Sequence, residues 1–456
     1  MIYERLKTSL LTLLVLLSIL LTWKLWTYQP NYGLIAEEPQ YLKDISIGKK
    51  LDLIDVFQPT KLIFHLENKN YGTEKTSKIA SIYRDMQNWN LQSFYLLPER
   101  FTNINELTSM DESVEIIFPA PLSADIIRFI FKLSEEQYAL DGVERIVLSA
   151  NINTGKDETI AHFISTSERK VLEAEINNIP FSAIIENYLL DAHVQTPYYK
   201  YVISDNKGYS NIIYLADKVQ TLKALTYTAS KLKAEDQLKD VLFSDPKYVR
   251  KTQSGSEEET YTDGKRALEF LHELNMMKYI NPLQQHKNNE FDEKMLLQSY
   301  QFINDHSGWT DRFLYYMRDE EKESVTFRQY INNFPIFSTN LANKQSDLAT
   351  IYVSWREGQV HEYIRSLIDI ERELVENGEI QLARGSKVIN YLYYLQEIKE
   401  FNPTLLKDIT VGYQMYHINT NLIFLKPSWF IHYNGNWQAL NYEPQIEEGE
   451  EQDGLE

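Results

Sequence analysis

The feature that most constrains this chain is an apolar run near its N-terminus, LLTLLVLLSILL at residues 10–21. The 16 residues between Lys7 and Lys24 carry no charge. As a helix, residues 8–28 would cover about 30 Å, at about 1.5 Å per residue, which matches the hydrocarbon core of one bilayer. The run therefore predicts one transmembrane helix, with nearly all of the remaining chain on a single side of the membrane.

The flanks of this run give its orientation. Six side chains have the types that anchor a helix at the membrane interface: Arg5, Lys7, Trp23, Lys24, Trp26 and Tyr28. Positive charge is retained on the cytoplasmic side, so the N-terminus is expected inside and the bulk of the chain outside the cell. A cleaved signal peptide would share the basic start and the apolar core. However, bulky residues follow Leu21 where a small-x-small cleavage site would be needed, which favours an uncleaved anchor.

One side of the predicted helix is distinct from the rest. Thr8, Thr12, Ser18 and Thr22 fall on one face, with Val15 among them, whereas leucine covers most of the remaining circumference. The spacings of Thr8 to Thr12 and of Ser18 to Thr22 are small-xxx-small pairs, which let two helices approach closely in lipid. This face is a candidate contact for a partner helix. The alternative is that each hydroxyl bonds a carbonyl of its own preceding turn.

Composition narrows the function of the exported part. The formal net charge is −19, and it becomes −21 once residues 1–28 are set aside. Such an acidic surface argues against binding nucleic acid or anionic headgroups. The chain has no cysteine, which excludes thiol catalysis and cysteine-ligated metal sites. Its 31 tyrosines favour strands, because aromatic side chains suit a half-buried pleated surface.

The order of strand and helix patterns predicts an α+β fold of antiparallel sheets with packing helices after the single transmembrane helix. Helices are expected at 73–86, 167–179, 234–243, 291–306 and 386–398. Strands are expected at 62–66, 91–97, 113–119, 143–150, 158–165, 198–204, 211–217, 222–229, 247–252, 259–264, 266–274, 312–317, 323–330, 349–355, 360–367, 408–416, 421–427 and 428–434. Similar runs of strands around one helix recur in the middle and last parts of the chain.

These patterns divide the chain into five regions. The expected ranges are 1–28 for the cytoplasmic stub and transmembrane helix, 29–190 for an N-terminal mixed α/β domain, 191–285 for a middle α+β domain, 286–444 for a C-terminal α+β domain and 445–456 for a disordered acidic tail. The tail has six acids in twelve residues and no packing side chains, which is typical of disorder.

Chemical motifs are nearly absent. There is no H-E-x-x-H, no G-x-S-x-G and no phosphate-binding glycine loop, so neither a metal nor a cofactor is expected. Ser167 and Lys170 form an S-x-x-K string, and Ser204 to Asn206 form S-D-N, as in penicillin-binding serine acyl enzymes. The third element, K-T-G, does not occur, and S-x-x-K arises again at Ser230. The sequence therefore predicts no catalytic residues and a binding or regulatory role, with a serine acyl enzyme as the remote alternative.

Several stretches together resemble one known family. The opening ERLKTSLLTLLVLLSILLTWKLWTYQPNY, then HSGWTDRF at 306–313, TVGYQMY at 410–416 and LKPSWFIHYNGNW at 425–437 are similar to the YycH family. The later stretches are also similar to the shorter companion family YycI.

The resemblance implies a membrane-anchored accessory protein of an essential histidine kinase in Gram-positive bacteria. Its implied partners are the WalK (YycG) kinase and YycI, contacted largely through transmembrane helices, with effects on the WalR (YycF) regulator and cell-wall metabolism genes. It also implies that residues 286–444 share a fold with YycI, and it carries over no catalytic residues. A second copy of the chain is a further candidate partner. An extracytoplasmic module that senses a cell-wall fragment is the alternative function.

Overall fold

The structure is a computed structural model that describes residues 47–442 except for 99–102, 152–153, 205–209, 255–257, 283–293, 339–346 and 420, together with six positions nearer the N-terminus. Those six are Arg5, Lys7, Leu11, Val15, Leu17 and Ser18. Contacts within the chain separate residues Met1–Ile45 from one compact unit, Ser46–Glu456.

The predicted transmembrane helix falls mostly outside the described residues. No helix among the described residues is long and apolar enough to cross a membrane. Seven of the predicted face and anchor residues lie outside the described part: Thr8, Thr12, Thr22, Trp23, Lys24, Trp26 and Tyr28. The predicted tail at 445–456 also lies outside it. Both segments therefore stay predictions.

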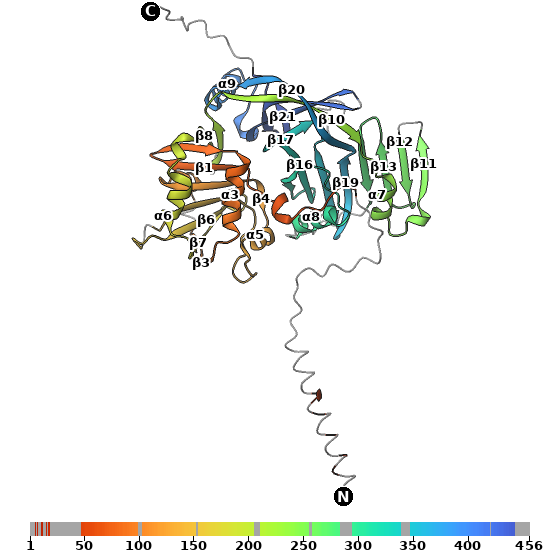
Figure 1. Cartoon of the computed structure of the whole chain (residues 1–456), viewed down its shortest axis with the longest axis horizontal. Coiled ribbons are helices and arrows are strands. Elements are labelled where there is room, and N and C mark those ends of the chain that lie inside the picture. Colours follow the sequence, from red (N-terminus) through yellow and green to blue (C-terminus); the bar gives the residue numbers. More distant parts are fainter. Residues whose placement is uncertain are drawn as a thin grey trace, which may run out of the picture. The chain divides into compact units, whose positions relative to one another are not determined.

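The compact unit contains two large sheets, so the predicted α+β class of antiparallel sheets with packing helices is confirmed. The first sheet has nine strands, in the spatial order β3 (Leu91–Leu96), β7 (Lys170–Ile176), β6 (Thr159–Ser165), β5 (Val143–Ala150), β4 (Ser113–Leu122), β1 (Lys61–Leu66), β2 (Lys69–Thr73), β8 (Thr196–Ser204) and β9 (Ser210–Ala216). Figure 1 shows this sheet in red to yellow, with helices against it. Strand β1, which lies between β4 and β2 inside the sheet, is buried over its middle four residues, as expected of a strand covered on both faces.

The second sheet takes its strands from residues 220 to 439. Its spatial order is β11 (Arg250–Ser254), β12 (Glu258–Thr262), β13 (Ala267–Leu271), β14 (Met276–Ile280), β19 (Gln359–Ser366), β18 (Thr350–Arg356), β16 (Ser324–Ile331), β17 (Phe334–Ser338), β21 (Leu406–Asn419), β22 (Leu422–Tyr433), β10 (Gln220–Lys231) and β20 (Ile368–Leu382), with β15 (Phe313–Asp319) on β16 and β23 (Asn436–Ala439) on β22. Strands β17 and β21 pair in parallel, whereas the other described pairs are antiparallel.

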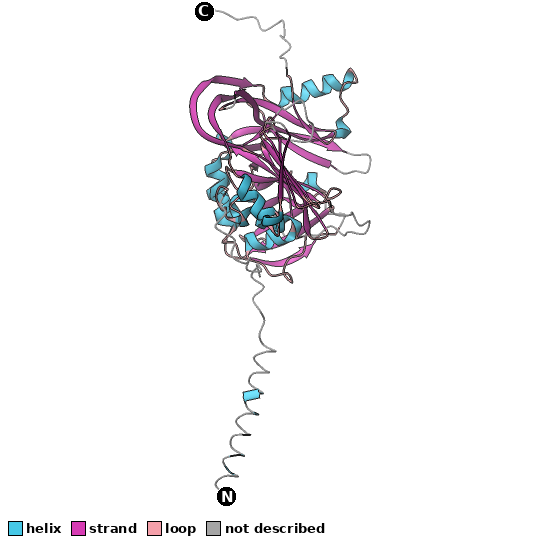
Figure 2. Ribbon diagram, turned by 90° about the vertical axis from the view of Figure 1, so that its right-hand side faces the viewer, coloured by secondary structure: helices cyan, strands magenta, loops and turns pink. Residues whose placement is uncertain are grey.

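Helices cover the apolar faces of both sheets, and Figure 2 shows most of them gathered on one side of the strands. They are α2 (Leu53–Val56), α3 (Thr76–Met86), α4 (Ile104–Leu107), α5 (Ala124–Phe131), α6 (Phe181–Ile184), α7 (Glu235–Leu242), α8 (Met295–Asp305) and α9 (Gly385–Glu397), with short turns at Ile185–Leu189, Ala192–Val194, Pro246–Tyr248 and Pro403–Leu405. Helix α3 illustrates the pattern, because Ile79, Ile82, Tyr83 and Met86 recur at three- and four-residue spacing and are all buried.

The helix predicted from residue 167 is wrong. Residues 166–169 form a turn, and strand β7 follows at Lys170–Ile176. The Glu168 N–H does point at the Ser165 hydroxyl at 3.4 Å, the contact expected of a helix cap, but Arg169 has a φ of 57° and reverses the chain. Pairing of Lys170 with Ser165 then continues the hairpin with β6. Tertiary pairing has overridden a local capping signal.

The two strands predicted at 421–427 and 428–434 form one strand, β22. Pro427 lies inside it, opposite Tyr413 of β21. On its other side, β10 pairs only with residues 422–425, so the missing N–H of Pro427 breaks no ladder there. The predictions also missed β20, β2, β14, β17, β23 and α5.

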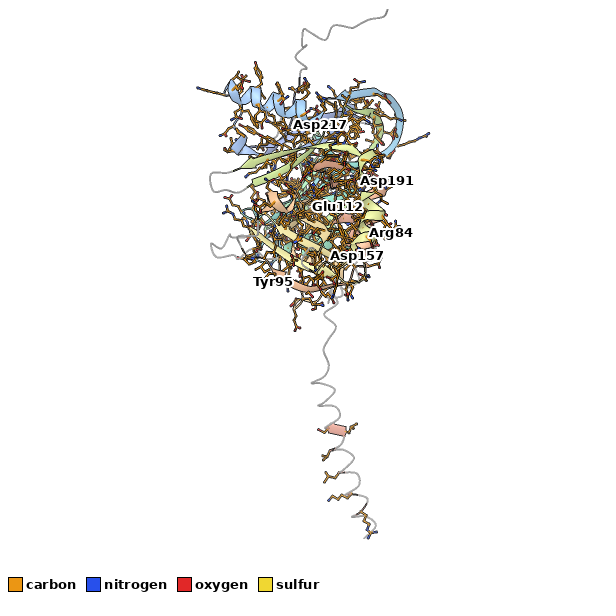
Figure 3. All side chains as sticks on the ribbon, turned by 90° about the vertical axis from the view of Figure 1, so that its left-hand side faces the viewer. Arg84, Tyr95, Glu112, Asp157, Asp191 and Asp217 are labelled. Carbon is orange, nitrogen blue, oxygen red and sulfur yellow. The ribbon has the colours of Figure 1, made fainter. Side chains whose placement is uncertain are left out.

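The two sheets share one core. The largest group of buried apolar residues runs from Leu53 to Leu367 and includes Ile116 of the first sheet and Phe327 of the second. Asp217, which is labelled in Figure 3, follows β9. Its carboxylate accepts a hydrogen bond from the Ser386 N–H, in the first turn of α9, at 3.0 Å. The ranges 29–190, 191–285 and 286–444 stay predictions, because the contact pattern keeps Ser46–Glu456 as one compact unit.

Candidate functional site

The candidate site is the place where the chain enters the compact unit, which we call the leader strap and define as residues 47–57. It lies against the turn 306–309 in the second half of the sequence. The Gly48 N–H donates to the Ser307 carbonyl at 2.7 Å. Lys49 and Trp309 then exchange two backbone hydrogen bonds, at 2.9 and 3.3 Å. The strap is thus held by backbone pairing to residues more than 250 positions away.

Glycine at position 48 makes this approach feasible. A Cβ added there would lie 2.4 Å from the Trp309 carbonyl oxygen, closer than carbon and oxygen can come without a shift of backbone. Gly308, in the facing turn, is similarly confined, because its Cβ would lie 2.6 Å from His306 Nε2. Two close backbone approaches therefore depend on two glycines.

Side chains of α8 form hydrogen bonds with the strap. The Asn304 carboxamide oxygen accepts hydrogen bonds from the Leu51 N–H at 2.9 Å and from the Trp309 indole at 3.1 Å. The Tyr300 hydroxyl donates to the Leu51 carbonyl at 2.7 Å. Trp309 is fully buried, and its ring packs edge-on against Phe327 at 5.1 Å between centroids. One helix face thereby fixes both the strap and the turn.

A buried arginine organises the turn. Arg365 of β19 is 1% exposed, and its guanidinium donates to the Gly308 carbonyl at 2.6 Å and to the Tyr363 hydroxyl at 3.2 Å. A third bond, at 3.3 Å, reaches the Thr310 hydroxyl. The Tyr363 hydroxyl also lies 3.1 Å from His306 Nε2. Burial, with Arg365 next in effect, lowers the pKa of His306 to about 3, so this imidazole is neutral at physiological pH.

An acidic pair lies at the end of the same turn. Burial, and after it the neighbouring carboxylate of Asp369, raise the pKa of Asp311 to about 7. The charges of Arg365 and Lys49 act in the opposite direction but do not outweigh burial. Gln329 donates to the Asp311 carboxyl at 2.9 Å. Because Lys49 belongs to the strap, the protonation of Asp311 is linked electrostatically to the docked strap.

The strap ends at the junction of the two sheets. Its last residue, Phe57, is buried against Tyr315 and Phe327 of the second sheet, at ring distances of 5.4 and 6.3 Å. The Tyr83 hydroxyl of α3 donates to the Phe57 carbonyl at 2.6 Å, on the side of the first sheet. Phe57 therefore connects the end of the strap to a helix beside the first sheet and to strands of the second sheet.

The predicted partner-helix face is only partly described. Val15 and Ser18 are exposed, as are Arg5 and Lys7, and Val15 is 52% exposed. The remaining face and anchor residues lie outside the described part, so this site stays a prediction.

Among the described residues of the acyl-enzyme motif, the serine and the lysine each have other partners. The Lys170 ammonium pairs with Glu168 at 2.6 Å, and the Ser167 hydroxyl lies 3.4 Å from that of Ser165. Ser204 ends β8, and Asp205 and Asn206 fall outside the described residues. No group of three or more histidine or acidic residues suited to a metal ion occurs among the described residues. The arrangement of the strap offers mechanical and electrostatic coupling, not a nucleophile.

Sequence reasoning did not identify the strap as a site. The stretch 306–313 carried a signal for it, because His306, Ser307 and Trp309 all take part in the contact with the strap. A single sequence, however, gives no indication that residues 47–49 pair with it.

Comparisons with known proteins cover almost the whole chain. Two family models match, described as "YycH protein, N-terminal domain" at residues 4–189 and "YycH protein, C-terminal domain" at residues 210–447. A Bacillus subtilis (strain 168) protein, "Two-component system WalR/WalK regulatory protein YycH", is 22% identical over 446 residues, which is 95% of each chain.

The crystal structure of YycH from Bacillus subtilis is similar at a TM-score of 0.70, with 17% identity, over 86% of this chain and 98% of that one. A structure of an uncharacterized Eubacterium rectale protein matches at a TM-score of 0.33, over 51% of this chain and 84% of that one, at 12% identity. At such identities the first of these structures shows the fold alone, and the second supports no argument.

Proposed function

Because the chain belongs to the YycH family, we propose that it is a membrane-anchored regulator of a WalR/WalK two-component system that modulates the WalK sensor kinase together with YycI. The observation that carries this proposal is the pair of family models, which match residues 4–189 and 210–447. The printed name of the Bacillus subtilis relative supports the choice of signalling system. The same proposal includes an effect on cell-wall metabolism and a YycI-like fold for residues 286–444.

In this proposal residues 8–28 cross the cell membrane once, with the N-terminus in the cytoplasm and Ser46–Glu456 outside. The interface anchors Arg5, Lys7, Trp23, Lys24, Trp26 and Tyr28 fix the depth of the helix. Thr8, Thr12, Val15, Ser18 and Thr22 face a helix of the kinase. Small and hydroxyl-bearing side chains support such a contact, because helix association in lipid depends on close backbone approach and hydrogen bonds.

The leader strap supplies the connection between the two parts. Extracytoplasmic contacts, with YycI or with the kinase, would change the position of the strap against the turn 306–309. Since the strap directly follows the segment that leads to the membrane, this change would reach the helix that contacts the kinase. The sheet junction at Phe57 is the part of the fold that both sheets can influence.

The test replaces Thr8, Thr12, Ser18 and Thr22 together by leucine. Co-purification of the full chain with WalK from detergent-solubilised membranes should fall about ten-fold, because the loss of close packing and hydrogen bonds between helices costs about 1–2 kcal/mol. Membrane insertion should stay unchanged, since leucine is at least as apolar as threonine.

The matched control replaces Leu10, Leu13, Leu17 and Leu20, on the opposite side of the predicted helix, by isoleucine. This variant should co-purify as the unmodified chain does. Equal co-purification of the leucine variant and the unmodified chain would overturn the assigned face. Recovery of the chain from the soluble fraction would overturn the anchor.

A sensor of a cell-wall fragment is the second candidate function. A polar cavity at the junction of the two sheets favours a sensory role, although its volume of about 90 Å³ admits a compound of a few heavy atoms and not a glycan or peptide fragment.

A further inference from the structure

A cavity lies at the junction of the two sheets. It offers about 90 Å³ to the centres of water-sized molecules. One water needs about 10–15 Å³ on that measure, so the space suits a compound of a few heavy atoms. The side chains that matter are Lys61, Glu74, Arg145, Tyr316, Tyr330 and Asp408. Lys61 lies on β1, Glu74 directly after β2 and Arg145 on β5. Tyr316 lies on β15, Tyr330 on β16 and Asp408 on β21.

The two cations of the lining already have partners. The Lys61 ammonium donates to the Tyr214 carbonyl at 2.8 Å and pairs with Glu74 at 3.2 Å. The Arg145 guanidinium pairs with the buried carboxylate of Glu115 at 2.6 Å. Neither positive charge is left to attract an anionic ligand into the cavity.

Asp408 differs from these groups. Its carboxylate accepts a hydrogen bond from the adjoining Ile409 N–H at 2.8 Å, and it takes part in none of the ion pairs between described residues. Burial raises the pKa of Asp408, although Lys61 and Arg145 act in the opposite direction and Glu74 adds to the rise. The cavity thus contains one acidic group whose negative charge is poorly compensated.

Two phenol groups complete the lining. Tyr316 is 8% exposed and Tyr330 is 4% exposed. No hydrogen bond of either hydroxyl occurs in the described part of the chain, and neither oxygen is among its fully buried unpaired polar atoms, which is consistent with hydroxyls that face the cavity. All three groups line the same cavity. Burial raises the pKa of both phenols, and the charge of Asp408 makes a smaller contribution to each rise. The Arg328 guanidinium above the Tyr316 ring is itself bonded to Asp347.

We propose that this cavity binds a small primary ammonium compound, with the ammonium group between the Asp408 carboxylate and the hydroxyls of Tyr316 and Tyr330. An ammonium group has three N–H donors and no acceptor, which matches one carboxylate and two hydroxyl oxygens. Because residues of both sheets line the cavity, a ligand that fills it should stabilise the junction. The proposal goes beyond the role in kinase regulation and does not depend on it.

The test uses the full chain in a neutral detergent and ethylammonium chloride as the probe, with sodium chloride at equal ionic strength as the reference. Binding by calorimetry should be saturable, and the midpoint of thermal unfolding should rise by about 2 °C at saturation. Asp408→Asn, which keeps the size and the acceptor for Ile409, should weaken the affinity at least about ten-fold.

Two further variants make the result specific. The double change Tyr316→Phe and Tyr330→Phe keeps both rings and should also weaken the affinity about ten-fold, since it removes two acceptors. Asp369→Asn changes a half-buried strand carboxyl outside the cavity and should bind as the unmodified chain does.

Three results would overturn the proposal. They are the absence of saturable binding, equal affinity of the Asp408→Asn variant, and an equal effect of sodium chloride, which would mean water or any monovalent cation in the cavity. If Asp408→Asn does not fold, the tyrosine double variant decides by itself, because equal affinity in that variant would contradict the assigned contacts.

Discussion

At the scale of single residues, the compact unit is marked by charged groups buried where two parts of the chain meet. Glu115 is fully buried between His65 and Arg145, and although burial itself opposes ionisation, those partners lower its pKa to about 2. The stabilisation from this carboxylate is therefore present above pH 4.5 and is lost as the pH falls toward about 2. Asp311 behaves in the opposite way, because burial and Asp369 raise its pKa.

The raised pKa of Asp311 gives a prediction about stability and pH. The protonated form is favoured in the folded chain, so its contribution is full below the ordinary pKa of 3.8 and is lost as the pH rises to about 7. Asp311→Asn should raise the free energy of unfolding at pH 8 by about 1–2 kcal/mol and have little effect at pH 4. Urea unfolding at both pH values measures this difference. Asp191→Asn, at an exposed carboxyl, should show equal stability changes at the two pH values, and a similar result for Asp311→Asn would refute the linkage.

At the scale of elements, the docked strap shows why a short segment without regular structure can be well fixed. Residues 47–51 have one isolated β-bridge and no helix, yet they make backbone bonds to the turn 306–309 and side-chain bonds to α8. The Arg365 guanidinium holds the turn 306–309 through hydrogen bonds. The position of the strap thus depends on side chains that are distant from it in sequence.

Gly48→Val tests this contact. The added atoms would collide with the Trp309 carbonyl, so the strap should leave the turn while the sheets stay folded. The free energy of unfolding should fall by about 2–3 kcal/mol, as expected when several hydrogen bonds are lost together. Hydrogen exchange should become faster at the amides of Lys49 and Trp309. Lys50→Ala, at an exposed neighbour, should leave both quantities unchanged, and unchanged exchange in Gly48→Val would show that the strap is not held as described.

At the scale of the whole molecule, polar contacts join the two sheets alongside the shared core. Asn333, which is 4% exposed, donates from its carboxamide to the carbonyls of Thr60 at 3.1 Å and Glu74 at 2.7 Å. The Tyr315 hydroxyl donates to the Pro121 carbonyl at 2.8 Å. Arg318 pairs with Asp141 at 2.9 Å. These contacts lead us to expect that both sheets unfold in one cooperative transition.

Asn333→Asp tests this coupling. The change replaces an amide donor by a carboxylate facing two carbonyl oxygens, so the free energy of unfolding should fall by about 2–4 kcal/mol. Urea unfolding should show one transition in the unmodified chain and a lower midpoint in the variant. Asn332→Asp is a matched control, since Asn332 is exposed and also has a left-handed backbone, with φ of 50° against 68° at Asn333. Equal midpoints for the two variants would contradict the role of Asn333.

Local patterns in the sequence were sufficient for most elements. Two strand-like runs on either side of a turn-rich stretch, at 143–150 and 158–165, predicted the hairpin of β5 and β6, and the spacing of apolar residues predicted α3 and α8. Both patterns depend on which face of an element is buried, and a few neighbouring residues determine that. The resemblance carried by 306–313 and 410–416 gave the family, whereas the membrane helix at 8–28 stays a prediction of the sequence alone.

Contacts between distant residues determined the rest. The capping signal at Ser165 indicated a helix, but pairing with β6 made residues 170–176 a strand. The segments 421–427 and 428–434 were expected as two strands, but pairing with β21 runs through Pro427 and makes them one. The strap at Gly48 and the cavity at Asp408 each combine residues separated by more than 250 positions. Most of the strands and helices and the acidic character of the chain followed from the sequence, because those depend mainly on neighbours along the chain. Only the tertiary structure decided where the strap docks and which charges are buried, because burial depends on what the fold places on the other side.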